Sequence, residues 1–477
     1  MTECSHDSLC FQDLGARRVV AAFDGGKITS DAGGLLLREV EAKFGFLERF
    51  AACFTDHRDP DLIEHPLADL LKQRVFGLCL GYEDLIDHDR LRHDPLLAVL
   101  VGKADPLGGG RARAADRGKA LAGKSTLNRL ELTPARAGAA SRYKKIVAHL
   151  GLIEDYLVDM FLLQHAAPPP RVVLDLDATD DPLHGDQLGG FFHGDYGGYC
   201  YLPLYIFCGD HPLCARLRPG DIDARSGALK QVQRIVARIR QQWPGVPILL
   251  RADSGFCREP LMRWCEGHGV DYLFGLAKNG RLVRALGREL HEAKGESERT
   301  GRPARRFKDF TDRTRTSWSR ARRVVGKAEH LAKGPNPRFV VTSLPAEARD
   351  ARALYERDYC ARGEMENRLK EQQLCLFADR TSCLTMRADQ VRLYLSTVAY
   401  VVMRALREHG LTGTALARAQ CGTIRLALFK IGALVRVSVR RVAVALSGAY
   451  PFRELFAAVC HNLRRCAAPR PAAVPTG

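Results

Sequence analysis

The stretch RVVLDLDAT, residues 171–179, combines an apolar strand pattern with two acids, Asp175 and Asp177. Side chains of a strand alternate between its two faces, so acids two residues apart lie on the same face. A carboxylate on a buried strand costs free energy unless it is ion-paired or binds a metal. The pattern therefore predicts a central strand whose end carries carboxylates for a specific reason.

A second strand pattern ends in the same way. VPILLRADSGF, residues 246–256, runs from apolar residues into Asp253, followed by the turn-forming Ser254 and Gly255. An aspartate at a strand end can also serve only as an Asx-turn or a helix cap. Two strands of one sheet that both end in carboxylates favour a functional site at that edge.

A third acid lies on a predicted helix. In YCARGEMENRLKEQQLCLF, residues 359–377, Tyr359, Arg362 and Glu366 fall at spacings that place them on one helical face. A salt-bridged surface helix would show the same charges. Together with Asp177 and Asp253, however, Glu366 would complete an all-oxygen site suited to Mg²⁺ or Mn²⁺. Two such ions ~4 Å apart can activate a water or a 3′-hydroxyl for phosphodiester displacement.

The pattern around these acids predicts an α/β fold with a mixed sheet. Strands are expected at 171–179, 199–209, 212–220, 246–253 and 270–277, with helices at 229–243 and 259–269. Three strands in sequence, followed by alternating helices and strands, are typical of an α/β arrangement. Pro203 argues against a regular strand at 199–209.

The charge of the chain favours a polyanionic partner. Lys and Arg number 72 against 55 Asp and Glu, a formal charge of +17. Residues 299–333 carry 12 basic and 3 acidic side chains, and residues 401–477 carry 12 and 2. A solvated basic face is the alternative for a single basic run, but two separate basic regions indicate nucleic acid.

The motif GKALAGKST, residues 118–126, matches the pattern of a phosphate-binding loop, which must join a buried strand to a helix. Here a Gly-, Ala- and Arg-rich segment precedes it, so we predict that it binds no ATP. Lys124 and Arg129 are instead candidate contacts to DNA phosphates.

No segment has the length and apolarity of a membrane span, and the sequence predicts a cytoplasmic protein.

These features resemble a known family, the DDE transposases of bacterial insertion sequences, which have a ribonuclease-H-like core. The resemblance rests on the D-x-T of Asp177 and Thr179, on Asp253, and on most of the signature Tyr-x2-Arg-x3-Glu-x6-Lys around Glu366. It extends to the segments HGDYGGYCYLPLYIF, residues 193–207, and ENRLKEQQLCLFADRTS, residues 366–382. The chain is thus similar to the branch with a β-rich insertion before the catalytic glutamate.

The resemblance implies that Asp177, Asp253 and Glu366 are catalytic and hold two Mg²⁺ ions, with Mn²⁺ as a substitute. Asp175 is the rival for the first carboxylate, and Thr179 favours Asp177. By the same resemblance, Tyr359 and Arg362 contact DNA phosphate. The final Lys of the signature falls at Gln373, with Lys370 one turn earlier, and either residue could contact DNA.

The resemblance also implies an organisation and a function. We expect a ribonuclease-H-like core with a mixed five-stranded sheet, and Trp318 either stacks on a displaced base or is a buried packing residue. The expected segments are a helical DNA-binding region at 1–165, the core at 170–280, a basic β-rich insertion at 281–345, the catalytic-glutamate helix at 346–385, and a mainly helical, basic region for DNA binding or dimerisation at 386–477.

The expected activity is binding of terminal inverted repeats in double-stranded DNA, cleavage there and strand transfer into target DNA, by a nucleoid-associated homodimer. A related nuclease without transposition activity and a DNA-binding regulator remain the alternatives.

Overall fold

The computed structural model describes residues 8–183, 185–194 and 196–467. Contacts divide this part of the chain into two compact units. The sheet unit comprises residues 148–374 and 378–397, and the helical unit comprises residues 8–147, 375–377 and 398–467. Each unit is therefore built from segments that are distant in sequence, and each is described separately.

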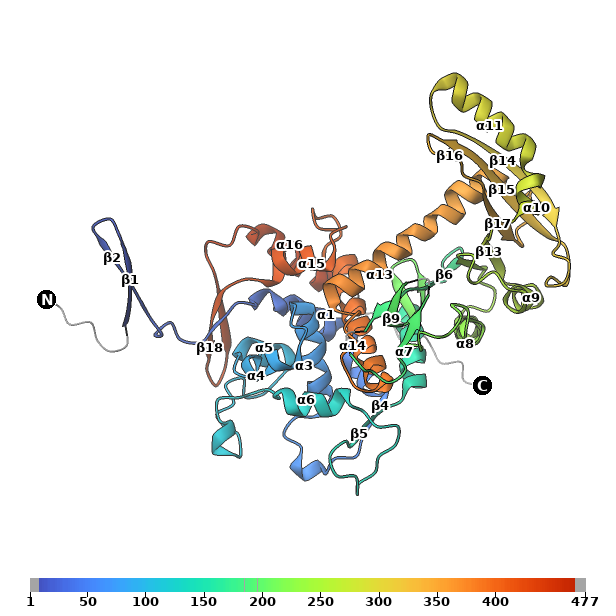
Figure 1. Ribbon diagram of the computed structural model, residues 1–477. Coiled ribbons are helices and arrows are strands. Elements are labelled where there is room, and N and C mark those ends of the chain that lie inside the picture. The colour runs from blue at the N-terminus through green and yellow to red at the C-terminus, as the bar shows by residue number, and fades with distance from the viewer. Residues whose placement is uncertain (1–7, 184, 195, 468–477) are drawn as a thin grey trace. The chain divides into compact units, whose positions relative to one another are not determined.

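A mixed sheet of nine strands forms the sheet unit (Figure 1). Its order is β11-β10-β6-β12-β13-β17-β15-β14, and β16 pairs with β15. The strands are β6 (Val172–Ala178), β10 (Leu204–Cys208), β11 (His211–Arg216), β12 (Ile248–Ala252), β13 (Asp271–Leu276), β14 (Ala304–Asp312), β15 (Arg322–Leu331), β16 (Gly334–Pro335) and β17 (Arg338–Thr342). The expected α/β fold with a mixed sheet is confirmed.

The sheet is larger than the five strands predicted. The five expected strands correspond to β11, β10, β6, β12 and β13. Beyond them, β17 pairs antiparallel with β13, β15 pairs with β17, and β14 pairs with β15. Residues 304–342 therefore continue the sheet, because the open edge of β13 offers backbone groups that β17 can pair with. Helices α10 (Gly280–Ala285) and α11 (Gly287–Thr300) precede these strands, and α11 packs on β14 and β15.

Apolar cores lie on both faces of the sheet. Leu174 and Leu176 of β6 point into a large core with α7 (Leu150–Leu163), α8 (Ala228–Gln242) and α9 (Glu259–Gly267). Val173, on the opposite face, packs against a smaller core that includes Leu354 and Tyr355. Because residues alternate along β6, Asp175 and Asp177 share the face of Val173.

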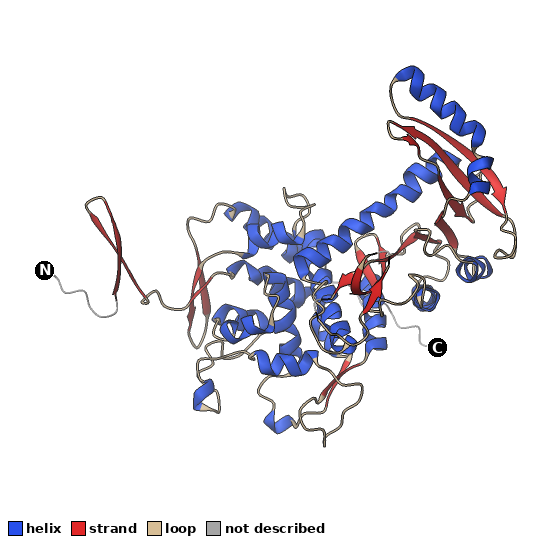
Figure 2. Ribbon diagram, in the orientation of Figure 1, coloured by secondary structure: helices blue, strands red, loops and turns tan. Residues whose placement is uncertain are grey.

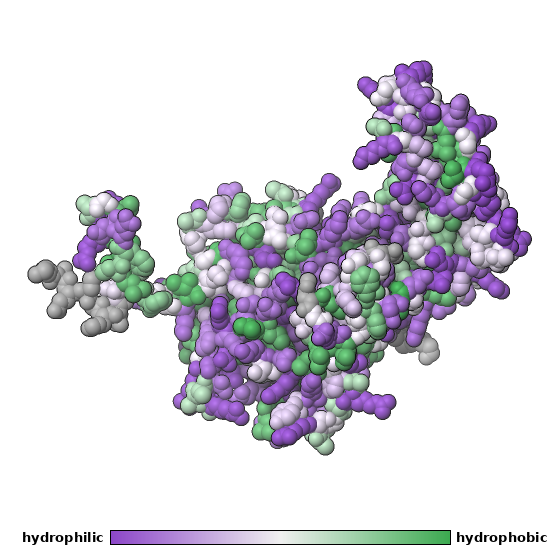
Figure 3. Space-filling view, in the orientation of Figure 1, coloured by the Kyte–Doolittle hydropathy of each residue, from purple (hydrophilic) through white to green (hydrophobic). Residues whose placement is uncertain are grey.

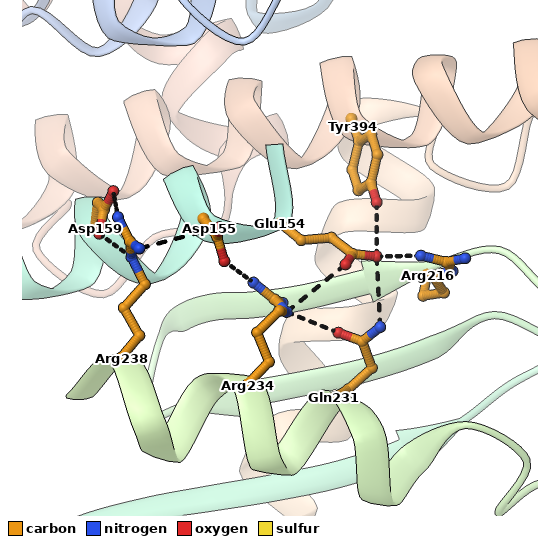
Figure 4. Close-up of polar contacts among 8 residues, drawn as sticks. All are labelled: Glu154, Asp155, Asp159, Arg216, Gln231, Arg234, Arg238 and Tyr394. Carbon is orange, nitrogen blue, oxygen red and sulfur yellow. Dashed lines mark hydrogen bonds and ion pairs between the residues drawn. The ribbon is translucent and has the colours of Figure 1, made fainter. Parts of the chain in front are cut away.

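Ion pairs fix α7 to α8 and β11 (Figure 4). Glu154 is 4% exposed, pairs with Arg216 of β11 and Arg234 of α8, and accepts a hydrogen bond from Tyr394 at 3.3 Å. The ladder continues with Asp155 and Arg234 at 2.9 Å and with Asp159 and Arg238. Helix α7 falls within the helical region expected at 1–165, but its apolar face and its acids join it to the sheet unit.

Pro203 interrupts the second predicted strand, as its missing N–H group requires. The segment divides into β9 (Gly198–Tyr201) and β10, which belong to different sheets. Strand β9 pairs with β7 (Asp181–Pro182) and β8 (Phe191–His193) in a small three-stranded sheet. The glycine-rich sequence between the first and second predicted strands therefore contributes the short strand β8.

The helix expected around Glu366 is present but irregular. It begins as α12 (Ala351–Ala353), continues through a π-helical turn η5 (Leu354–Tyr359) and a 3-10 turn η6 (Cys360–Arg362), and becomes α13 (Gly363–Leu376). π-helical turns occur frequently at functional sites. After a loop, α14 (Met386–Ala405) follows.

Helices are the main regular elements of the helical unit, as expected for the N-terminal region (Figure 2). Its helices are α1 (Leu35–Phe44), α2 (Phe46–Ala51), α3 (Leu67–Leu80), α4 (His88–Leu91), α5 (Pro95–Val101), α6 (Lys124–Glu131), α15 (Cys421–Ile424) and α16 (Arg453–Arg465), with short turns η1 (Ala32–Gly34), η2 (Pro60–Leu62), η3 (Leu85–Asp87), η4 (Ala114–Asp116), η7 (Leu406–Gly410) and η8 (Arg425–Phe429). A two-stranded sheet of β4 (Phe54–Asp56) and β5 (Ile146–Ala148) completes the packed part.

The first and last parts of the chain meet in this unit. Strand β18 (Ala433–Val437) pairs with β19 (Val442–Leu446) and with β3 (Ile28–Thr29). Lys43 of α1 donates a hydrogen bond to the carbonyl of Leu463 in α16 at 3.2 Å. The stretch ALVRVSVRRVAVAL, residues 433–446, in which apolar and basic residues partly alternate, thus forms a hairpin within a region expected to be mainly helical.

An N-terminal hairpin was not predicted. Strands β1 (Ser8–Leu14) and β2 (Arg17–Ala22) pair antiparallel, and all but one of their residues are exposed. Its apolar side chains include Phe11 and Val20, which are 58% and 57% exposed, and both hydrophobic and hydrophilic residues lie on its surface (Figure 3). A hairpin without a buried face lacks the burial pattern on which strand prediction depends.

No helix within the described ranges combines the length and apolarity required to span a bilayer.

Candidate active site

Asp177 and Asp253 lie at the same level on neighbouring strands. The parallel register of β6 and β12 pairs Asp175 with Arg251 and Leu176 with Ala252, so the next residues outward are Asp177 and Asp253. Neighbouring strands are about 4.8 Å apart. The two carboxylates therefore belong to one edge and one face of the sheet, as the sequence predicted.

Asp253 also forms the turn that was considered as its alternative role. Its Oδ1 accepts a hydrogen bond from the backbone N–H of Gly255 at 2.9 Å. Asp177 Oδ1 accepts one from the N–H of Ala178 at 3.1 Å. In both residues the second carboxylate oxygen, Oδ2, is not used in these bonds.

Asp175 is bound by an arginine that the sequence analysis did not consider. Arg251 Nε and Nη2 donate to the two oxygens of Asp175, each at 2.7 Å, and Arg251 Nη1 donates to the carbonyl of Asp358 at 2.6 Å. Asp175 is 4% exposed, and burial raises its pKa above the ordinary value although Arg251 opposes that effect. The pair joins β6 to β12 and to the turn that carries Tyr359.

Arg362 links Asp177 to Glu366. Its Nη2 donates to Glu366 Oε1 at 2.9 Å, and its Nη1 lies 3.5 Å from Asp177 Oδ1. The side chains of Arg362 and Asp177 are each 16% exposed, whereas that of Glu366 is 45% exposed. The structure thus brings all three predicted carboxylates to one place, with Arg362 bridging two of them.

The electrostatics of Asp177 reflect this crowding. The pKa of Asp177 is raised to about 6, chiefly by burial; the nearby charges of Asp253 and Glu366 contribute to this rise, while Arg362 opposes it. Carboxylates that repel one another in a partly buried site favour a bound cation. Arg362 is the main positive charge that lowers the pKa of Asp177.

The Tyr359 hydroxyl lies over β13, the strand next to β12, at the level of Asp253. Gly275 of β13 follows Phe274, which pairs with Ala252, so Gly275 is level with Asp253. A Cβ atom at Gly275 would lie 2.5 Å from the Tyr359 hydroxyl oxygen and 2.9 Å from the backbone nitrogen of Ser254. The absence of a side chain at Gly275 therefore makes room for the tyrosine hydroxyl beside Asp253.

Lys370 and Gln373 continue the helix beyond Glu366. Lys370 is exposed and Gln373 is partly exposed. Lys370 lies one turn after Glu366, at the spacing that keeps it on the same face of α13. Their neighbour Glu371 is 2% exposed and pairs with Arg368, so it is part of the packing.

Trp318 is a buried packing residue, which was one of its two predicted roles. It is 6% exposed, belongs to the large core, and has the Arg322 guanidinium 5.5 Å from its ring centre. Arg322 is itself held by Glu259 and Glu266. The indole therefore offers no free face to a nucleic-acid base, and its predicted contact with DNA is wrong for this structure.

Lys124 and Arg129 belong to the helical unit. Lys124 opens α6, its side chain is 52% exposed, and its Nζ lies 3.5 Å from Asp89 Oδ2. Arg129 is exposed on the same helix. The apolar run before the motif is helix α5, so GKALAGKST does not join a strand to a helix.

Two residues of the site were missed at the sequence level, Arg251 and Gly275. Arg251 is a charged residue within an apolar strand and lies two positions before Asp253, a signal that could have found it. Gly275 gives no such signal, because the need for a glycine at this position arises from the close approach of the Tyr359 hydroxyl in the folded protein.

The fold and this cluster define a class of protein: an α/β protein with an acidic site at one edge of a mixed sheet, completed by a glutamate from a helix. The model of the family described as "Transposase DDE domain group 1" matches residues 11–468. The chain therefore belongs to the DDE transposase family. No curated protein matches it.

A solved structure shows a weak likeness. The chain is similar to the piggyBac transposase in its synaptic complex with hairpin DNA, studied by cryo-EM, with 11% identity and a TM-score of 0.41. The match covers 84% of this chain and 79% of that chain.

Proposed function

We propose that this transposase binds the terminal inverted repeats of an insertion sequence, cleaves DNA there and joins the freed 3′-hydroxyl to target DNA. The observation that carries the proposal is the convergence of Asp177, Asp253 and Glu366 around Arg362 at one edge of the sheet. We further assign the strands β11-β10-β6-β12-β13 to a ribonuclease-H-like core, and the strands from β14 to β17 to its insertion.

The residues at this edge fit divalent cations. No group of three His, Cys, Asp or Glu in the described part of the chain already has the geometry of a metal site, and Arg362 lies between two of the carboxylates. The donors are nevertheless all carboxylate oxygens, the set preferred by Mg²⁺ and Mn²⁺. The pKa of Asp177 is raised mainly by burial and also by the charges of Asp253 and Glu366, and a bound cation would offset both effects.

In this proposal Asp177, Asp253 and Glu366 hold two ions. Mg²⁺ bound there would lower the pKa of a water or a 3′-hydroxyl and offset charge on the leaving oxygen. Asp175 is not assigned as a ligand, because Arg251 binds both of its oxygens. The three ligands come from two strands and a helix, so the sheet fixes two of them relative to one another.

Arg362 and Tyr359 would position the scissile phosphate. Arg362 can exchange its contact with Glu366 for a phosphate oxygen, since guanidinium groups bind phosphates with two parallel hydrogen bonds. The Tyr359 hydroxyl, beside Asp253, can donate to a second oxygen. Lys370, Gln373, Lys124 and Arg129 are proposed as further contacts to the backbone of double-stranded DNA, and a homodimer on paired ends as the active species.

The proposal is tested with the purified full-length protein and duplex DNA that spans both flanks of its gene. We expect Mg²⁺-dependent cuts at the ends of inverted repeats and joining of the cut ends to a target plasmid, and neither product with EDTA. Cuts without joining would leave only a nuclease, and specific binding without any metal-dependent product would leave only a DNA-binding regulator. Either result contradicts the proposal.

Gly275→Ala should impair cleavage because a methyl group there displaces Tyr359 and the turn after Asp253. We expect a loss of about 10²-fold in the cleavage rate, as for a misplacement of about 1 Å at a reacting centre. Single-turnover cleavage measures it. Gly295→Ala on α11 is the control, since a Cβ atom there meets nothing within 4 Å. If the two variants cleave DNA at equal rates, Tyr359 does not act in the proposed site.

A further inference from the structure

The β18–β19 hairpin, Ala433–Leu446, lies in an unusually basic part of the chain. Between Glu408 and Glu454 the sequence has no acidic residue and seven Lys or Arg. Three of these arginines, Arg436, Arg440 and Arg441, are in the hairpin. These 45 residues contain no Asp or Glu, so no carboxylate from this segment lies near these arginines.

The two faces of the hairpin differ. Val435 is 3% exposed and packs inward, whereas Arg436 on the opposite face is exposed. Arg436 pairs across the hairpin with Ala443, and Ala445 follows on the same face. Around Arg436 the outer face thus carries the small side chains of Ala443 and Ala445, which let another molecule approach the backbone.

The tip of the hairpin is tight and exposed. The Ser438 N–H donates to the carbonyl of Arg441 at 2.9 Å, and the Ser438 hydroxyl donates to the same carbonyl at 3.0 Å. Val439 is fully exposed, and Arg440 and Arg441 beside it are exposed. Within the described ranges, none of the three hairpin arginines forms an ion pair or a side-chain hydrogen bond.

A hollow of about 310 Å³ adjoins the tip and adds more positive charge. Residues 437–442 form one wall, and Arg38, Val99, Gly102 and Lys103 belong to the other. Among the described residues, Arg38 donates to the carbonyl of Val99 at 2.6 Å and to no carboxylate, whereas Lys103 is paired with Asp69 at 2.7 Å. Arg38 is therefore a fourth arginine without an acidic partner at this place.

We propose that the β18–β19 hairpin is a DNA-binding element whose tip enters a groove of duplex DNA. Arg436, Arg440 and Arg441 contact phosphates on the groove walls, Arg38 supports them from the hollow, and Val439 lies against the base edges. The inference rests on the proposed function, which supplies duplex DNA as the polyanion.

The geometry favours duplex DNA over another protein. Charge complementarity requires a partner with closely spaced negative charges, and duplex DNA carries one per ~1.7 Å of axis. A two-stranded ribbon fits the major groove, which is ~12 Å wide. A fully exposed valine between arginines suits a groove whose floor carries thymine methyl groups.

The test is the salt dependence of DNA binding by the double variant Arg440→Ala/Arg441→Ala. Each phosphate contact contributes about 0.9 to the slope of log K against log salt, so the slope should decrease by about 2. Fluorescence anisotropy with duplexes from the flanks of the gene, and with an unrelated duplex, measures it at several salt concentrations. Arg49→Ala, an exposed arginine on α2, is the matched control and should retain the wild-type slope.

The outcomes separate this inference from the proposed function. If the double variant keeps the wild-type slope and affinity while wild type binds and cleaves DNA, the inference is wrong and the proposed function stands. If the wild-type protein binds no duplex DNA, both this inference and the proposed function are wrong. If the double variant melts at a lower temperature than wild type, the single variant Arg436→Gln, which lies outside the turn, is used to measure the same salt dependence of DNA binding. A change in oligomeric state with unchanged DNA binding would make the hairpin a protein contact and overturn the inference.

Discussion

Replacement of Asp177, Asp253 or Glu366 by alanine is expected to abolish Mg²⁺-dependent cleavage while DNA binding stays close to wild type. The three carboxylates meet at one edge of the sheet and are proposed to act as a unit, so removal of any one should cost about 10³-fold or more in rate. Single-turnover cleavage and anisotropy on the same DNA measure the two properties.

One neighbouring residue and one combined variant provide controls for this experiment. Glu364→Gln changes an exposed acid two residues before Glu366 and should leave cleavage within about threefold of wild type. A triple alanine variant should be no worse than the single variants, since residues that act as a unit are not additive. Cleavage retained by all three single variants would refute the site.

Arg251→Met is expected to lower the free energy of unfolding by about 3–5 kcal/mol, because it leaves the buried Asp175 without its cation. The loss of the hydrogen bond to the Asp358 carbonyl adds to the effect. Urea unfolding followed by circular dichroism measures it. The double variant Asp175→Asn/Arg251→Met should recover part of the loss, since no unpaired charge then remains buried.

Arg238→Met is the control for that prediction. Arg238 and Asp159 are 34% and 38% exposed, so the loss of this pair should cost about 1 kcal/mol or less. If Arg251→Met were no more destabilising than Arg238→Met, the pair with Asp175 would not support the sheet.

The sequence sufficed for the central strands and for the three carboxylates, because both depend on local periodicity. Apolar alternation located β6 and β12, and the two-residue period placed Asp175 and Asp177 on one face. The spacing of Arg362 and Glu366 predicted a shared helical face, and the structure joins them by a hydrogen bond at 2.9 Å.

What could not be predicted depends on pairing between distant residues. The continuation of the sheet through β17 needs the register of β13, and the pair of Arg251 with Asp175 needs the register of β12 with β6. The burial of Trp318 follows from packing under Arg322. The exposed hairpin β1–β2 has no buried face, so no periodicity reveals it.

The bidentate pair of Asp175 and Arg251 has a consequence for how this gene can change. A substitution at either position alone leaves a buried charge, so relatives should differ at both positions together or at neither. Two apolar residues of similar volume would be an acceptable replacement. Asp177, two residues away and without such a partner, should remain aspartate in every active copy. An alignment of relatives would then show coupled variation at positions 175 and 251 beside an invariant position 177.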